Sequence, residues 1–107
     1  MVIEYDNDTP VEIELTAEGL TCLCPVNGRQ DRFDVLIRYV PATRLIELGW
    51  LRAHLEGFAG VAVLHEPFTA DLLDTLVNLV VPSYIHVTTT WAPVEGIGCS
   101  VRAVAGE

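Results

Sequence analysis

The chain has 107 residues, half of them hydrophobic and a fifth charged, which suits one folded domain with a single core. No apolar run reaches the roughly 20 residues of a membrane-spanning helix, so no such helix and no membrane partner are expected. The formal net charge is −9, there is no lysine, and all six basic residues are arginine, which disfavours nucleic-acid binding through a basic surface. The odd number of cysteines and the absence of a signal-peptide pattern predict a cytoplasmic protein with reduced thiols. Residues 1–107 are expected to form one domain.

The first half of the chain predicts two antiparallel strands. Residues 11–15 alternate apolar and polar side chains, as a half-buried strand does, and this strand can continue toward Cys24. Residues 25–30 contain proline and glycine and predict a turn. Residues 33–40 are rich in strand-forming side chains, and Pro41 ends the segment.

Two helices are predicted next. Thr43 can cap a first helix over residues 44–56, because leucines recur there at helical spacing. A second helix is expected to begin near Glu66 and Pro67, since proline suits a first turn, and to stop at Pro82. Its apolar face has the same periodicity.

Two further strands are predicted over residues 84–91 and 98–104, joined by residues 92–97. The order of strand, strand, helix, helix, strand, strand predicts an α+β fold with a four-stranded antiparallel sheet and two helices on one face. Such a sheet leaves its two outer edges open. A ring or barrel of subunits would remove those edges, so a homo-oligomer is expected.

Covalent chemistry is indicated by a thiol and three acid–base groups. Cys24 stands on the predicted turn, Asp31 follows seven residues later, and His65 and Glu66 precede the second helix. A thiol attacks as its thiolate, and a covalent adduct needs a nearby group to move protons. A zinc site made by Cys22, Cys24 and His65 is the alternative, but no Cys-x-x-Cys spacing supports it, so no metal is expected.

The run from Cys24 to Asp31, the strand over residues 37–41 and the pair His65-Glu66 together resemble the 7-cyano-7-deazaguanine (preQ0) reductase family of the tunnelling fold. The resemblance implies that Cys24 attacks the nitrile carbon of preQ0 and forms a thioimide. Asp31 would manage the proton on the nitrile nitrogen, Glu66 would bind the ring N–H groups, and His65 would lie beside the substrate. It also implies a ring assembly with sites at subunit interfaces, for which a pentamer and a decamer are candidates.

One segment differs from the reductases of that family. In them, the first helix carries two lysines associated with NADPH, whereas this chain has Gly49 and Arg52 at those positions. The resemblance is therefore to the shorter branch, the QueF-like archaeosine synthases, which also share the pattern of residues 64–66 and 70–73. That branch implies an amidinotransferase that needs no redox cofactor. Ammonia attacks the thioimide of preQ0 held in transfer RNA or another nucleic acid, giving a formamidine.

Two alternatives stay open. One is an NADPH-dependent reductase that makes the aminomethyl product preQ1, and the other is a ring-forming protein that only binds deazapurines. The remaining notable side chains are interpreted as structural or as surface groups. Cys22 and Cys99 are expected to pack in the interior, His54 and His86 to be structural or solvated, and the larger aromatic residues to lie in the core or an interface. Three arginines are expected to cluster near the thiol turn, either as surface charge or as contacts to a nucleic-acid phosphate: Arg29, Arg32 and Arg38.

Overall fold

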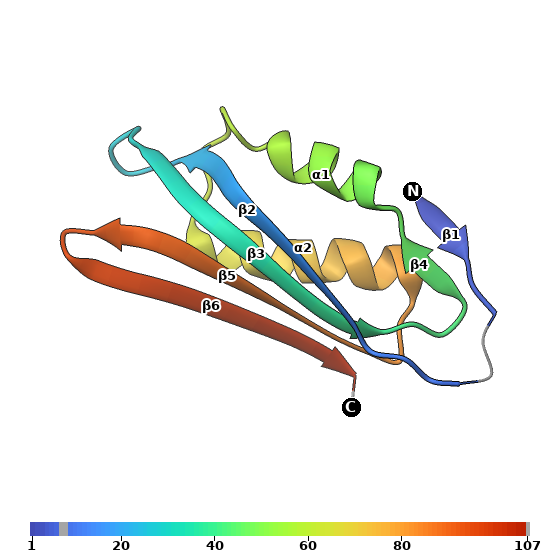
Figure 1. Ribbon diagram of the computed structural model, residues 1–107. Helices are drawn as coiled ribbons and strands as arrows, with labels where there is room; N and C mark the ends of the chain where they lie inside the picture. Colours follow the sequence, from blue (N-terminus) through green and yellow to red (C-terminus); the bar gives the residue numbers. More distant parts are fainter. Residues whose placement is uncertain (7–8, 107) are drawn as a thin grey trace.

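A four-stranded antiparallel sheet, in the order β2-β3-β5-β6, carries both helices on one face (Figure 1). The computed structural model describes residues 1–6 and 9–106. The strands of this sheet and the two helices are β2 (Ile13–Leu23), β3 (Gln30–Val40), β5 (Tyr84–Val94), β6 (Ile97–Gly106), α1 (Leu48–Glu56) and α2 (His65–Val80). The predicted α+β class and the predicted order of these elements are confirmed.

The core lies between the helices and the two central strands. Alternate residues of β3 and β5 face the helices, and the register pairs them directly across the sheet. These cross-strand pairs are Phe33 with Trp91, Val35 with Thr89, Ile37 with Val87 and Tyr39 with Ile85. Helix α2 covers them with its buried side, which includes Phe68, Leu72 and Leu76. Period-2 strands and a period-3.6 helix thus bury their apolar sides against each other.

A short second sheet, made of β1 (Val2–Glu4) and β4 (Arg44–Ile46), corrects the prediction of a helix over residues 44–56. The backbone of the predicted first turn pairs with the N-terminal strand instead. The buried backbone N–H of Ile46 also donates to the hydroxyl of Tyr39, at 3.1 Å. Helix α1 therefore begins four residues later, and Glu47 rather than Thr43 caps it by accepting from the backbone N–H of Trp50.

Three strands of the main sheet, β3, β5 and β6, are longer than predicted. β5 and β6 run on to a tight turn at Glu95 and Gly96, both with positive φ, so residues 92–97 are mostly strand and not a loop. This geometry is the hairpin turn that matches the twist of the strands, and glycine adopts it without strain. β2 and β6 form the two edges of the sheet. No helix in the described part of the chain is long and apolar enough to cross a membrane.

Candidate active site

The loop between β2 and β3 presents Cys24. The backbone N–H of Cys24 donates to the carbonyl of Arg29 at 2.8 Å, and its carbonyl accepts from the N–H of Gly28, also at 2.8 Å. Asn27 closes the turn by accepting from the N–H of Arg29 at 2.9 Å. Gly28 has φ +73°, a backbone conformation that residues other than glycine rarely adopt. Since Cys24 stands just beyond the last strand residue, its side chain is partly exposed and not packed in the sheet.

Cys22 and Asp31 are direct partners across β2 and β3, and both side chains therefore point to the same face of the sheet. Cys22 is completely buried. Burial, followed by the charge of Asp31 and the nearby Cys24, raises the pKa of the Cys22 thiol to about 11. At neutral pH Cys22 is therefore a protonated core residue, in agreement with the packing role expected for it.

The segment before α2 is attached to the end of β2. The backbone N–H of Leu23 donates to the carbonyl of Val61 at 2.9 Å, and the N–H of Val63 donates back to the carbonyl of Leu23 at 3.0 Å. This short parallel bridge fixes where α2 begins relative to the thiol loop. It explains how His65, 41 positions beyond Cys24 in the sequence, comes to lie on the same cavity.

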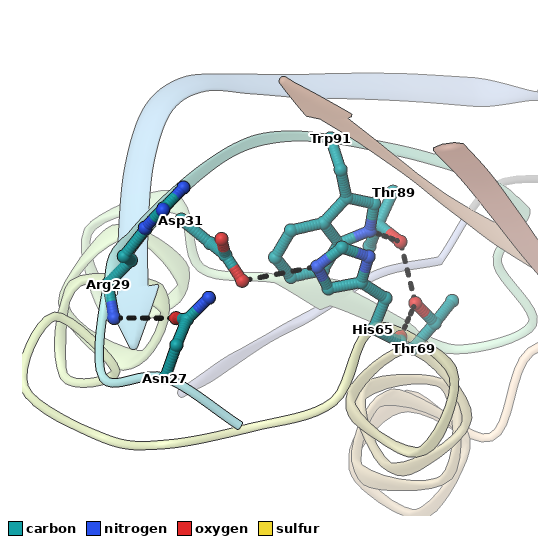
Figure 2. Close-up of polar contacts among 7 residues, drawn as sticks. All are labelled: Asn27, Arg29, Asp31, His65, Thr69, Thr89 and Trp91. Carbon is teal, nitrogen blue, oxygen red and sulfur yellow. Dashed lines mark hydrogen bonds and ion pairs between the residues drawn. The ribbon is translucent and has the colours of Figure 1, made fainter. Parts of the chain in front are cut away.

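His65 and Asp31 face each other. Nε2 of the imidazole lies 3.3 Å from Oδ2 of Asp31, and the two side chains are 21% and 10% exposed (Figure 2). An ionised carboxylate only accepts hydrogen bonds, so this contact requires the imidazole hydrogen on Nε2. The His65 ring also stacks on the indole of Trp91, with ring centroids 3.7 Å apart and planes 8° apart. The imidazole is thus held both at its face and at one nitrogen.

A cavity of about 430 Å³ joins the four residues that the sequence singled out. Its walls come from the thiol loop, the start of β3, the segment before α2 and the β5–β6 turn. They include Cys24, Asp31, His65 and Glu66, together with Asn27, Arg29 and Glu95. The structure therefore brings all four predicted site residues to one cavity, while the roles assigned to them stay predictions.

The cavity lining is acidic. Asp31, Glu66 and Glu95 contribute carboxylates, and Arg29 is the arginine in the lining. Such an environment favours a ligand that presents N–H donors or positive charge. It gives less support to a site filled by several phosphate groups.

The sequence analysis missed two residues of this site. Trp91 was assigned to the core in general terms, although its ring forms the surface on which His65 stacks. Glu95 was placed in a connecting loop and given no role. A glutamate at a turn position with φ +54° is unusual for a residue with a side chain, and the Glu-Gly pair between two strands was the available signal.

The predicted cluster of three arginines is wrong for two of them. Arg38 lies seven residues along β3 from Asp31, and its guanidinium forms ion pairs with Glu14 of β2 and with Glu12 just before that strand. Arg29 belongs to the thiol loop and lines its cavity, whereas Arg32 follows Asp31 on β3, points to the opposite face of the sheet and lines a separate hollow. Within the described residues neither guanidinium forms an ion pair.

The two histidines outside the cavity differ in burial. His86 is buried on the sheet face that carries no helix, and burial together with Arg102 and Arg38 lowers its pKa. His54 stacks on Trp50 of α1 and lines a second, mostly apolar cavity of about 480 Å³ beside the first. Across residues 1–6 and 9–106, no three His, Cys, Asp or Glu side chains are grouped so that they could hold a metal ion.

Comparison with known proteins relates this geometry to one family. A family model described as "QueF-like protein" matches residues 31–107. An NADPH-dependent 7-cyano-7-deazaguanine reductase from Anaeromyxobacter sp. (strain Fw109-5) is 37% identical over 100 residues, covering 94% of this chain and 82% of the relative. A reductase of the same name from Sinorhizobium fredii (strain NBRC 101917 / NGR234) is 33% identical over 93 residues, covering 87% of this chain and 60% of the relative.

A solved structure gives the second comparison. The archaeosine synthase QueF-Like, in its apo form, superposes with a TM-score of 0.85 at 26% sequence identity, over 94% of this chain and 98% of that one. This match confirms the tunnelling fold that the sequence predicts. The named relatives are reductases and the solved structure is a synthase, so the comparisons agree on the family and divide on the reaction.

Proposed function

Because the chain belongs to the QueF-like protein family, we propose that it is an enzyme that converts the nitrile of preQ0 through a covalent adduct on Cys24. The observation that carries the proposal is the single cavity lined by Cys24, Asp31, His65 and Glu66. Those residues come from three separate places in the chain: the thiol loop, the start of β3 and the first turn of α2.

The first chemical step is addition of the Cys24 thiolate to the nitrile carbon. A C–S bond forms, one π pair of the nitrile moves to nitrogen, and that nitrogen takes a proton, giving a thioimide. Asp31, which is 10% exposed and in contact with His65, is the group that would take the proton of the Cys24 thiol and pass it to the nitrile nitrogen. Cys22 does not compete as nucleophile, because it is buried and its pKa is about 11.

Ring recognition is assigned to the carboxylates of the cavity. Glu66 is exposed in the first turn of α2 and lines the cavity, so its oxygens are free to accept N–H groups of a deazapurine. A deazapurine with a guanine-like edge presents neighbouring N–H donors, which two carboxylate oxygens accept well. Glu95 lies on the same cavity and adds a second acceptor.

Reduction to the aminomethyl product is the fate of the thioimide that the named relatives support, and the sequence analysis had ranked it second. The two hydrides that turn a nitrile into an amine would be supplied by NADPH. Arg29, which lines the cavity and forms no ion pair within the described residues, fits a phosphate group. The segment with Gly49 and Arg52 is less suited to bind a phosphate group, because Arg52 is already bound to Glu56 and to the carbonyl of Glu18.

Amidine formation is the second candidate, and the state of α1 favours it. Gly49 supplies no charge, and Arg52 is held at 3.0 Å from Glu56 and 3.2 Å from the Glu18 carbonyl. In this reaction ammonia adds to the thioimide carbon, the C–S bond breaks and the thiolate leaves, so no redox cofactor is consumed. The superposition with the archaeosine synthase QueF-Like supports this fate.

The state of the substrate and the assembly belong to the proposal as well. The net charge of −9 favours free preQ0 over a nucleic acid that carries it, unless Arg29 contacts a phosphate beside the cavity. Apart from the bridge at Leu23, the outer edges of β2 and β6 pair with no other strand among the described residues. Pairing of these edges between subunits would close a ring and cover them.

The experiment combines one adduct measurement with two turnover assays. Purified protein is incubated with preQ0 and analysed by intact mass spectrometry, and a gain equal to the mass of preQ0 is expected. Turnover is then measured separately with NADPH and with ammonium, and the product mass is read. Consumption of NADPH that depends on preQ0 identifies the reductase, and an amidine formed without NADPH identifies the transferase. A protein that binds preQ0 but forms neither an adduct nor a product would contradict the proposal and support the binding-only alternative.

A further inference from the structure

A chain of buried hydrogen bonds runs from the indole of Trp91 to the residue that opens α2. The Trp91 Nε1–H donates to the hydroxyl of Thr89 at 2.8 Å, and the hydroxyls of Thr89 and Thr69 lie 2.6 Å apart. The Thr69 hydroxyl donates to the backbone carbonyl of His65 at 2.8 Å (Figure 2). Both threonines are 0% exposed, so water does not complete these bonds.

The direction of this chain follows from counting hydrogens. Each hydroxyl has one hydrogen to donate. Since Thr69 donates to the His65 carbonyl, Thr89 must donate to Thr69. Thr89 can then only accept from the Trp91 N–H, which is the bond observed. All three hydrogen bonds therefore run in the same direction, from Trp91 toward His65, and hydrogen bonds arranged in this way strengthen one another.

The two ends of this series of hydrogen bonds are also in contact with each other, through the stacked rings of His65 and Trp91. His65, whose carbonyl is the last acceptor, stacks its imidazole on Trp91, whose N–H is the first donor. Trp91 is 3% exposed and is further packed by Phe33, stacked at 4.5 Å, and by the edge of Phe68 at 5.9 Å. The indole plane is therefore fixed by packing and by one hydrogen bond, and the imidazole plane follows it.

We propose that Trp91, Thr89 and Thr69 are positioning residues that set the plane of the His65 imidazole so that Nε2 points at Asp31. This inference rests on the proposed function, in which Asp31, in contact with His65, manages the proton of the adduct. Without the Thr89 hydroxyl, the buried Trp91 N–H has no acceptor, and an unsatisfied buried donor drives the ring to another orientation. The stacking surface for His65 moves with the ring.

The test compares Thr89→Val, which removes the hydroxyl at nearly constant volume, with Thr89→Ser, which keeps it. Proton NMR of the protein without substrate reads the ring protons of His65, which the stacked indole shifts upfield, and the exchange protection of the indole N–H. Both signals are expected to be lost in Thr89→Val and kept in Thr89→Ser. The rate of preQ0 adduct formation is expected to fall about tenfold in Thr89→Val, with an altered pH–rate profile, because small misplacement of a catalytic group is costly.

A second pair of variants keeps the test decisive if Thr89→Val does not fold. Thr69→Val and Thr69→Ser interrupt and preserve the chain at its other end. Thr75→Val is the matched control, because Thr75 makes the same bond to the carbonyl four residues earlier on α2, at 2.9 Å, away from His65. It removes one threonine hydroxyl from the same helix while leaving the ring signals and the pH–rate profile unchanged.

Two outcomes would overturn the positioning role. The first is an unchanged His65 ring shift and pH–rate profile in the valine variants. The second is a similar change in Thr75→Val. The NMR signals do not depend on substrate, so loss of stacking in a protein that forms no preQ0 adduct would refute the proposed function and leave the positioning role standing.

Discussion

The end of β2 and the loop that follows it hold two thiols in contrasting environments. Cys22 is the last buried residue of the strand, with no exposed surface and a pKa raised to about 11. Cys24, two residues later, is partly exposed and lines a cavity with Asp31 and His65. The chemistry of the two sulfurs differs because the sheet ends between them.

This contrast shows how the fold separates a packed thiol from an accessible one within three residues. The strand residue is enclosed by the helices, whereas the loop residue leaves the pleat and faces the segment before α2. That segment is fixed by the bonds of Leu23 to Val61 and Val63. The residue between the two cysteines therefore anchors the part of the chain that brings His65 to the second one.

The largest effect is expected when each of the two thiols is removed in turn. Cys24→Ala should abolish the preQ0 mass adduct completely, since no other accessible thiol lies on the cavity. Cys22→Ala should keep the adduct and lower the free energy of unfolding by about 1 kcal/mol, the usual effect of a methyl-sized void in a core. Intact mass spectrometry and chemical denaturation measure the two results. An adduct on Cys22 in the Cys24→Ala protein would show that the contrast between them is wrong.

The next effect concerns the proton. Asp31→Asn should slow adduct formation by about 100-fold, because general acid catalysis typically contributes at least that much. A time course of intact mass measurements with preQ0 in excess gives the rate of adduct formation. Asp74→Asn, an exposed residue on α2, is the matched control and should keep the wild-type rate. An Asp31→Asn protein that forms adduct as fast as this control would remove Asp31 from the mechanism.

Much of the fold could be predicted because local patterns and tertiary contacts agree. The alternation of residues 33–40 and the helical spacing in α2 correspond to faces that are buried in the structure. The pattern failed at residues 44–46, where leucine and isoleucine suit either a helix or a strand. Pairing with Val2–Glu4 decided for the strand, and a contact across 40 residues of sequence has no local signature.

The four candidate residues of the site could be named from the sequence because they stand in short motifs at turns and helix starts. Their supporting residues could not. Thr69 and Thr89 look like ordinary threonines in a helix and a strand, and the hydrogen bond between them exists only once α2 packs on β5. The position of Glu95 in the cavity lining depends on the β5–β6 turn, in which two residues with positive φ replace the longer loop that the sequence predicts.

A pH titration sharpens the comparison of the thiols. In the unfolded chain Cys22 loses its proton near pH 9, and in the folded chain near pH 11. Unfolding between these values therefore releases a proton, and stability must fall as pH rises, by a contribution of about 2 kcal/mol. Denaturation of wild type and Cys22→Ala from pH 8 to 11 measures it. The difference between the two proteins should shrink and then reverse with rising pH, and a constant difference would show that the Cys22 thiol is not shifted.

The smallest effect tests the backbone of the loop that separates the two environments. Gly28→Ala should lower the free energy of unfolding by about 1 kcal/mol, because its φ of +73° strains any side chain although a Cβ there would touch nothing within 4 Å. Gly98→Ala on β6 is the matched control: a Cβ there also meets nothing within 4 Å, and its φ is not in the left-handed region. Chemical denaturation should therefore separate the two alanine variants. If both lose the same stability, backbone strain does not shape the thiol loop, and Cys24 owes its position to the Leu23 bonds and the packing around them.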